Sequence, residues 1–217
     1  MIYKGFVGPS YPSQSPLADQ EMTMNWYPEP IQSEGASTQV ALYPTPGVEL
    51  LGTGVVGPGS AHFAQGSREF AIIGTTFYEV SELGLLTIRG TVAVNDTPGT
   101  ISSNGDGGGE LFITSGGNGY LFTLATDVLT SIAALAGIAT MGDHLDGYFL
   151  ALDASTSTVY LSDLLDGTTW DPLQFFQRSI APDPWVSMKV ANRYIYLFGS
   201  ETSEVWYDAG SFPIPFE

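Results

Sequence analysis

A β-hairpin unit that recurs along the chain is the sequence feature that most constrains the fold. In its clearest copy, a polar tip joins an apolar run at 148–152 to a second run at 159–162, and a turn follows at Asp166-Gly167. Short runs of strand-forming residues bounded by turn residues are typical of β-hairpins. The same unit recurs three more times, at 70–80, 111–124 and 194–207.

The second strand of each copy carries an aromatic residue, and these residues are 44, 38 and 46 positions apart: Tyr78, Phe122, Tyr160 and Trp206. A period of about 40–45 residues, with about four short strands in each period, is typical of the blades of a β-propeller. The sequence therefore predicts an all-β fold, a β-propeller with about four blades' worth of hairpins. An antiparallel sandwich whose hairpins are evenly spaced by chance is the alternative, because neither a WD nor a kelch signature is present.

The first 36 residues differ from the rest and predict an extended, Pro-rich docking arm. Residues 8–30 contain five prolines, which excludes a central strand. They also contain Tyr11, Trp26 and Tyr27, aromatic residues that favour docking on a surface over a solvated tail. A short helical turn is expected at 17–24, after Pro16 at its first position, and a strand at 39–43.

Residues 37–217 are expected to form the N-terminal part of the propeller. Residues 85–94 predict one or two inner strands of the second blade, and residues 95–109 predict a turn-rich loop. Residues 129–141 partly match a helical pattern, but Gly137 and the β-branched residues favour a strand or irregular structure. No strand follows the fourth hairpin to close the ring, so we expect a missing C-terminal part to complete it.

The net charge of −17 bears on the kind of partner that this chain can have. Its six basic residues are scattered: Lys4, Arg68, Arg89, Arg178, Lys189 and Arg193. Tight binding of nucleic acid requires several clustered cations, so it is not expected. The chain has no cysteine, which excludes disulfides and thiolate metal sites and fits folding in a reducing cytoplasm. No apolar run approaches the ~20 residues of a membrane span, so no membrane partner is expected.

The candidate catalytic and metal-binding residues all have a structural interpretation that is favoured. His62 and His144 lie outside any metal-ligand spacing, and we expect structural or surface roles for both. The loop at 103–110 superficially resembles a calcium loop, with oxygen ligands at Asn104, Asp106 and Glu110, but its glycines favour a turn.

Two carboxylate pairs, Asp143 with Asp146 and Asp163 with Asp166, are also better explained by turns, because glycine follows the second residue of each pair. Large aromatic residues such as Trp185 are expected to wedge between blades. We therefore predict no catalytic residues, no metal and no cofactor, and hence that the protein is not an enzyme.

Several strings of residues resemble the packaged-DNA stabilisation proteins of short-tailed, P22-like bacteriophages. In the arm, the strings are Ser15-Pro16, Ala18-Asp19 and Asn25-Trp26-Tyr27-Pro28-Glu29. Further strings are Leu42-Tyr43-Pro44-Thr45-Pro46-Gly47, Asp146-Gly147-Tyr148-Phe149, Asp166-Gly167-Thr168-Thr169-Trp170 and Ser203-Glu204-Val205-Trp206. Their shared order makes the resemblance more specific than any one string. The family is longer than this chain, in agreement with an incomplete ring.

The resemblance implies a virion structural protein of the tail hub, a head-completion factor made in the host cytoplasm. It would form a homo-oligomeric ring, expected to be a hexamer, below the portal. The ring would join the portal and adaptor proteins to the tail needle and tailspikes and retain the packaged DNA, which passes nearby without being bound specifically.

Neither catalytic nor metal-binding residues carry over from the family. The arm is the partner-binding candidate, with these residues: Tyr11, Pro16, Asp19, Trp26, Tyr27, Pro28 and Glu29. The alternative function from another class is an envelope-associated propeller that binds or hydrolyses glycans, for which convergent carboxylates and a secretion signal would be needed.

Overall fold

The computed structural model describes residues 25–31, 39–47, 56–94, 96–105, 107–177, 183–212 and 214–217. The chain divides into two compact units, Met1–Leu50 and Leu51–Glu217. Throughout the described residues the regular structure is antiparallel β-sheet, interrupted by one 3-10 turn at Ala133–Leu135. The all-β prediction is confirmed.

The described part of the first unit is a two-stranded hairpin. Strand β1 (Trp26–Ile31) pairs with β2 (Gln39–Pro44) in a register that runs from Trp26 opposite Pro44 to Ile31 opposite Gln39. The strand predicted at 39–43 is therefore present, but it pairs with the arm. The boundary expected at residue 36 accordingly falls inside this unit rather than at its end. The helical turn predicted at 17–24 lies outside the described residues.

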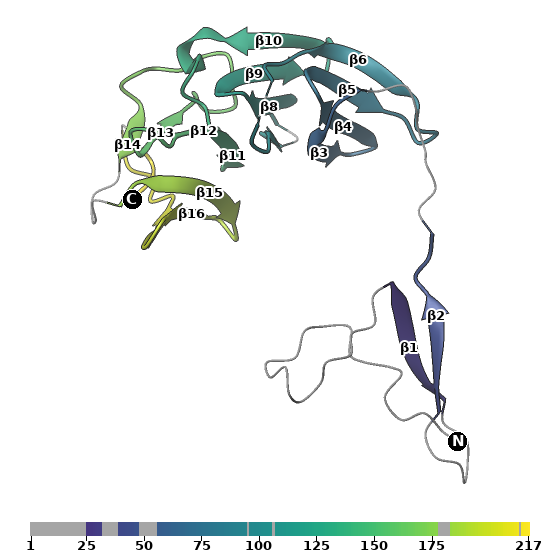
Figure 1. The fold of residues 1–217 in the computed structure, drawn as a ribbon. Coiled ribbons are helices and arrows are strands. Elements are labelled where there is room, and N and C mark those ends of the chain that lie inside the picture. Colours follow the sequence, from purple (N-terminus) through teal and green to yellow (C-terminus); the bar gives the residue numbers. More distant parts are fainter. Residues whose placement is uncertain are drawn as a thin grey trace. The chain divides into compact units, whose positions relative to one another are not determined.

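The described part of the second unit contains four sheets in chain order, one for each predicted hairpin (Figure 1). The first sheet contains β3 (Gly59–Gln65), β4 (Arg68–Ile73), β5 (Thr76–Val80) and β6 (Leu86–Thr91). The second contains β7 (Thr100–Ser103), β8 (Glu110–Ser115), β9 (Asn118–Thr123) and β10 (Val128–Ile132). The third contains β11 (Met141–Leu145), β12 (Tyr148–Asp153), β13 (Thr158–Leu161) and β14 (Phe175–Gln177). The fourth contains β15 (Trp185–Ala191), β16 (Tyr194–Gly199) and β17 (Ser203–Tyr207).

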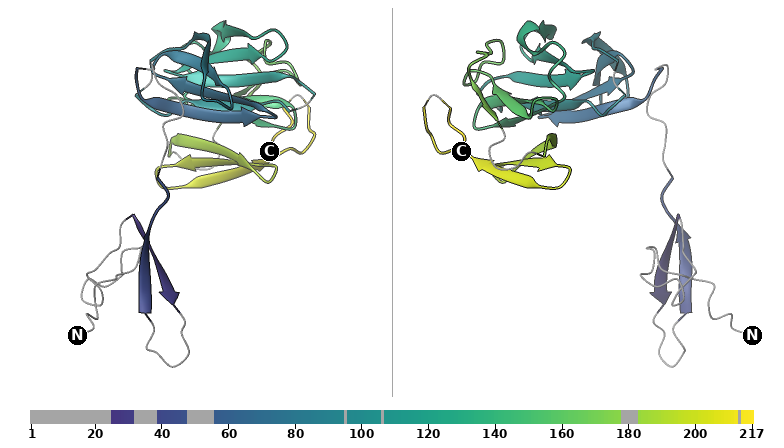
Figure 2. Two further views of the ribbon diagram at one scale, coloured as in Figure 1. Left: turned by 90° about the vertical axis from the view of Figure 1, so that its right-hand side faces the viewer. Right: turned by 60° about the vertical axis from the view of Figure 1, so that its left-hand side comes forward.

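Each of these sheets lies face to face with the next and forms one blade of the fold (Figures 1 and 2). The first strands of consecutive blades are in contact, β3 with β7, β7 with β11 and β11 with β15, so they form the inner side. On the outer side, β6 contacts β10. In the fourth blade the backbone of Glu217 exchanges two hydrogen bonds with Tyr207, at 2.9 and 3.0 Å, and so lies where a fourth strand pairs with β17.

In the described part of the second unit, the hydrophobic core consists of three clusters, each at a junction between consecutive blades. Phe70 and Phe77 pack on Phe122 between the first two blades. A second cluster fills the next junction, and a third, around the fully buried Trp185, joins the last two blades. A middle strand such as β8 or β12 is covered on both faces, which explains why its sequence is apolar throughout instead of alternating.

Two expectations about the order of strands were wrong. Residues 86–91 form β6, which pairs with β5 as the outer strand of the first blade and not as an inner strand of the second. The loop expected at 95–109 contains the inner strand β7. The non-helical expectation for 129–141 is confirmed, because β10 ends at Ile132 and the 3-10 turn follows. Trp185–Ala191 is an inner strand as predicted.

Candidate interaction surfaces

The predicted partner-binding residues that the structure describes lie together on strand β1 of the hairpin. Trp26 and Tyr27 are 48% and 57% exposed, and Glu29 is also exposed. Tyr43, opposite Tyr27 on β2, is 50% exposed. Successive strand residues point to opposite faces, so the hairpin presents aromatic rings on both faces.

The other predicted arm residues are only partly accounted for. Pro28 is placed by its backbone, opposite Leu42 in the β1–β2 pairing. Tyr11, Pro16 and Asp19 lie outside the described residues. The structure therefore brings four of the seven predicted residues onto one strand, and their role as a binding site stays a prediction.

A second exposed apolar surface covers one face of the fourth blade. It comprises Tyr194, Tyr196 and Phe198 of β16 and Val205 and Tyr207 of β17, called the blade-four face below. Phe198, Val205 and Tyr207 are 42%, 53% and 46% exposed. The rings of Tyr196 and Phe198 are stacked, with centroids 6.5 Å apart. Local sequence does not distinguish this strand from the buried middle strands, so sequence reasoning did not identify the surface.

Comparison with the earlier blades shows what this face corresponds to. The middle strands begin at Arg68, Glu110, Tyr148 and Tyr194, and the third residue of each points toward the following blade. In the first three blades this residue is fully buried in a junction cluster: Phe70, Phe112 and Leu150. The equivalent residue in the fourth blade is Tyr196, and its cross-strand neighbour Val205 is exposed. The blade-four face therefore occupies the position of a blade-to-blade junction.

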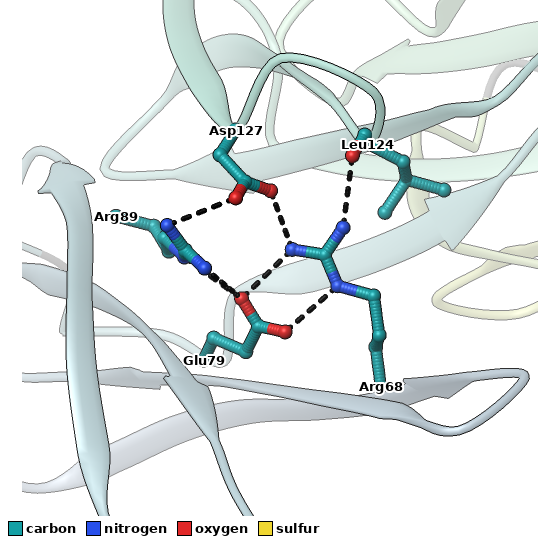
Figure 3. A network of polar contacts seen from close by, with 5 residues as sticks. All are labelled: Arg68, Glu79, Arg89, Leu124 and Asp127. Carbon is teal, nitrogen blue, oxygen red and sulfur yellow. Dashed lines mark hydrogen bonds and ion pairs between the residues drawn. The ribbon is translucent and has the colours of Figure 1, made fainter.

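A network of charged groups joins the first two blades at their outer side (Figure 3). Arg68 donates hydrogen bonds to both oxygens of Glu79 at 2.7 Å, to Asp127 at 2.5 Å and to the carbonyl of Leu124 at 2.9 Å. Arg89 completes the network with ion pairs of 2.6 Å to Glu79 and 3.1 Å to Asp127. The hydrogen bonds from Arg68 hold the pKa of Glu79 below its usual value against the opposing effect of burial.

The remaining described cations join the last two blades. Lys189 Nζ lies 2.8 Å from Asp143, and Arg193 Nη2 lies 2.8 Å from Asp146. All four Lys and Arg residues in the described ranges are thus paired with carboxylates of this chain, while Lys4 and Arg178 fall outside those ranges. The described surface accordingly offers no cluster of uncompensated cations that could hold phosphates.

The glycine-rich loop at 103–110 is closed by side-chain hydrogen bonds. The Asn104 side chain accepts a hydrogen bond from the Glu110 N–H at 3.0 Å and donates one to Glu110 Oε2 at 2.9 Å. Glu110 Oε2 also accepts from the Gly167 N–H at 2.9 Å, and burial raises the pKa of this carboxyl. Asp106 lies outside the described residues. Of the three candidate calcium ligands, Asn104 therefore closes the loop and Glu110 holds it to the Asp166-Gly167 turn.

The candidate carboxylates are likewise occupied by structural roles. Asp143 accepts hydrogen bonds from Lys189 and from the backbone of Val190. Asp146 has a φ of 50° in the turn between β11 and β12, and Asp166 accepts from the N–H and hydroxyl of Thr168, which lowers its pKa. Asp146 and Asp166 therefore lie in turns, as interpreted, whereas Asp143 lies on strand β11.

The two histidines lie apart from each other on different blades. His62, on β3, lies 3.8 Å from Glu69, and both side chains are more than half exposed. His144 lies edge-on to Phe149, and burial lowers its pKa. The described residues contain no group of three or more His, Cys, Asp or Glu side chains suited to a metal ion. In that part of the chain, no helix has the length and apolar character needed to cross a membrane.

Comparisons with solved structures show similarity of fold. The computationally designed Ika4 protein is 11% identical at a TM-score of 0.53, over 74% of this chain and 98% of that one. The designed Ika8 protein is 13% identical at 0.52, over 86% and 57%. Hsv2 of Kluyveromyces marxianus is 12% identical at 0.50, over 70% and 48%. This chain thus spans about half the length of the last two.

Sequence comparison identifies the family. No curated protein matches the chain. Residues 17–217 match the phage stabilisation family described as "Bacteriophage P22 Gp10, beta-propeller". This match confirms the propeller prediction over the sandwich alternative. The matched residues include both the arm hairpin and all four blades. The chain therefore belongs to the packaged-DNA stabilisation family of phage structural proteins.

Proposed function

We propose that this chain is part of a tail hub, a head-completion factor that joins the portal and adaptor region to the tail needle and tailspikes and retains the packaged DNA. The observation that carries the proposal is the family match over residues 17–217. Membership makes the chain a phage structural protein, whose site of action is the virion. The proposal adds to this membership the position of the protein in the tail and the partners named above.

The charge distribution supports a role beside DNA without specific binding. The chain carries a net charge of −17, and its described cations are all held in ion pairs within the chain. A surface of excess negative charge repels the DNA backbone, so DNA passes it without adhering. The proposed protein is therefore a wall of the exit path rather than a DNA-binding module.

Assembly as a homo-oligomeric ring, a hexamer in this proposal, requires surfaces that contact other subunits or adaptor proteins. The arm hairpin offers such a surface, because Trp26, Tyr27 and Tyr43 expose large aromatic rings. Aromatic residues are enriched at the centres of protein interfaces. The arm is accordingly the proposed docking element, which includes the predicted residues outside the described ranges.

A further blade is proposed to cover the blade-four face. The same face is buried at each of the three junctions within the chain, and here it carries stacked aromatic rings. An exposed apolar patch of this kind marks a contact surface. Residues 51–217 are in this proposal part of a larger propeller.

The glycan-binding alternative is not favoured. Family membership places the chain among phage structural proteins. The carboxylates that would act on a glycosidic bond instead stabilise turns and blade junctions, as for Asp143 with Val190 and Asp166 with Thr168.

Phage particles that lack this protein test the proposal directly. Heads should fill with DNA and then lose it, so the DNA becomes sensitive to added nuclease, and the particles should lack needle and tailspikes in electron micrographs. Supplying the intact protein should restore both features. Particles that lack the protein yet retain DNA and carry a complete tail would overturn the proposed function.

A further inference from the structure

The two outer edges of the arm hairpin differ in their capacity to form hydrogen bonds. The Thr45 N–H donates to the carbonyl of Asn25 at 3.2 Å. In an antiparallel pair, hydrogen-bonded and non-hydrogen-bonded residue pairs alternate along the strands. Given the register, this bond shows that the odd-numbered residues of β1 and β2 form the hydrogen bonds across the hairpin. The N–H and C=O groups of even-numbered residues therefore point away from the partner strand, toward the free edges.

On β1, the residues whose backbone groups point outward are Trp26, Pro28 and Pro30. Proline has no N–H, so this edge has a donor at Trp26 alone and cannot pair along its length. On β2, the residues whose backbone groups point outward are Val40, Leu42 and Pro44. This edge therefore keeps the N–H donors of Val40 and Leu42, together with the C=O acceptors of the same two residues. Among the described residues no third strand pairs with either edge.

A two-stranded hairpin is marginally stable in water, whereas three or more strands with a buried face are stable. We propose that the β2 edge pairs with the β2 edge of a second copy of this chain, to form a sheet in the order β1–β2–β2–β1. The pairing is antiparallel and centred on Ala41, which lies opposite Ala41 of the second copy. Val40 of each copy then exchanges two backbone hydrogen bonds with Leu42 of the other.

The chemistry of the edge favours a second copy as its occupant. Residues 35–48 contain no charged side chain, so two copies of a chain with a net charge of −17 approach there without local repulsion. The small side chain of Ala41 suits the close approach of a non-hydrogen-bonded pair, with Cα atoms about 4.5 Å apart. Because both outer edges of the resulting sheet are β1 edges, each with a donor at Trp26 alone, assembly ends at four strands.

This inference rests on the proposed docking role of the arm and specifies its contact. Six arms of a hexameric ring would combine as three such sheets. The docking role itself is tested separately, by deleting residues 1–36 and measuring whether the ring still assembles. If the deletion variant fails to assemble the ring, the docking role is supported. If the β2 edges of two copies nevertheless do not pair, the second copy is overturned as the occupant of the edge.

The chain has no cysteine, so a single introduced cysteine reports the contact cleanly. In the full chain with Ala41→Cys, two thiols meet at a Cα separation of about 4.5 Å, within the range that a disulfide spans. Mild oxidation should convert the protein to a covalent dimer, seen on a non-reducing gel. Tyr43→Cys is the positional control, because its two copies lie roughly 13 Å apart in this register, too far for a disulfide.

Backbone variants separate edge pairing from side-chain effects. Adding Leu42→Pro to Ala41→Cys removes the outward donor but no hydrogen bond of the hairpin itself, and should slow the cross-link about tenfold. Leu42→Ala is its matched control, which loses the side chain but keeps the N–H, and should cross-link like the parent. Equal rates for the two Leu42 variants, or equal cross-linking through Cys at 41 and 43, would overturn the proposal.

Opening the closed edge gives an independent test. Pro28→Ala with Pro30→Ala restores two donors on β1, so sheets can extend beyond four strands. Sedimentation of the full chain should then show species larger than those of the parent, increasing with concentration. A sedimentation profile unchanged from that of the parent would mean that the prolines do not limit pairing, and the edge argument would fail.

Discussion

Arg68 Nη2 and the carboxylate of Asp127 lie 2.5 Å apart and join the first blade to the second across 59 residues of sequence. The same guanidinium binds both oxygens of Glu79 in a fork geometry. Bidentate pairs of this kind are the stronger class of ion pair. The side chains of Arg68 and Glu79 are 28% and 18% exposed, so solvent screens the pair only in part.

Replacing Arg68 with Met should therefore destabilise the chain by about 2 kcal/mol, between the values of exposed and buried ion pairs. The loss arises because Glu79 and Asp127 stay partly buried with a single cation, Arg89. Denaturant unfolding measures the change. The matched control is Lys189→Met. Because the Lys189 side chain is 69% exposed, this change should lower the free energy of unfolding by less than about 1 kcal/mol. Equal losses would contradict the burial argument.

The same network predicts how stability depends on pH. The pKa of Glu79 is lower in the folded state, first through its hydrogen bonds from Arg68. The folded state then binds fewer protons than the unfolded chain, so this contribution is present above the unfolded pKa and is lost as the pH falls through the folded one. Asp183, whose pKa is lowered by hydrogen bonds from Ser200 and from the Glu201 and Thr202 amides, acts in the same direction.

Stability should therefore fall as the pH is lowered from about 5 to about 3. Glu79→Gln should be less stable than the parent at neutral pH, and its stability should decline less over that interval. Thermal unfolding across the pH series makes the comparison. Parallel curves for the two proteins would show that Glu79 does not contribute to the acid dependence.

Much of the second unit could be predicted because its signals are local. Turn dipeptides such as Asp146-Gly147 require positive φ, at 50° and 91°, and mark a hairpin wherever they separate apolar runs. The inner strands Thr100–Ser103 and Met141–Leu145 were missed because their residues are mostly small or polar, whereas the inner strand Trp185–Ala191 was predicted. Such strands pair with one neighbour and face the axis, so they need little apolar surface.

The candidate surfaces were predictable only in part. The aromatic residues of the arm are visible in the sequence, but the pairing of 26–31 with 39–44, which decides what each edge can bind, is not. The partners of Arg68 lie 11 and 59 residues away, beyond the reach of any local pattern. Tyr196 is only partly buried, unlike its equivalents in the other blades, because of its place in the order of blades, which is a property of the whole fold.

Close packing between the second and third blades predicts intolerance at Gly142. A Cβ at this position on β11 would lie 2.4 Å from the Phe112 ring of the neighbouring blade. Gly142→Ala should therefore destabilise the chain by about 1–3 kcal/mol, the usual cost of overpacking. Gly59→Ala is the control, since no atom lies within 4 Å of its added Cβ. Denaturant midpoints that move equally in both variants would refute the packing argument.

The blade-four face yields a prediction that separates folding from assembly. Tyr196 is equivalent to the fully buried Phe112, but it faces outward in this chain. Tyr196→Asp should therefore change the free energy of unfolding of the 217-residue chain by less than about 1 kcal/mol, whereas Phe112→Asp should unfold it.

In the phage, where a further blade is proposed to cover the face, Tyr196→Asp buries an unpaired carboxylate and should reduce the yield of particles that retain DNA at least about tenfold. Leu83→Asp is the control, because Leu83 is 80% exposed and lies in the turn between β5 and β6, away from this face. It should leave the yield unchanged. Normal yield with Tyr196→Asp would show that nothing covers the face, and equal losses in the two variants would show that surface charge alone is responsible.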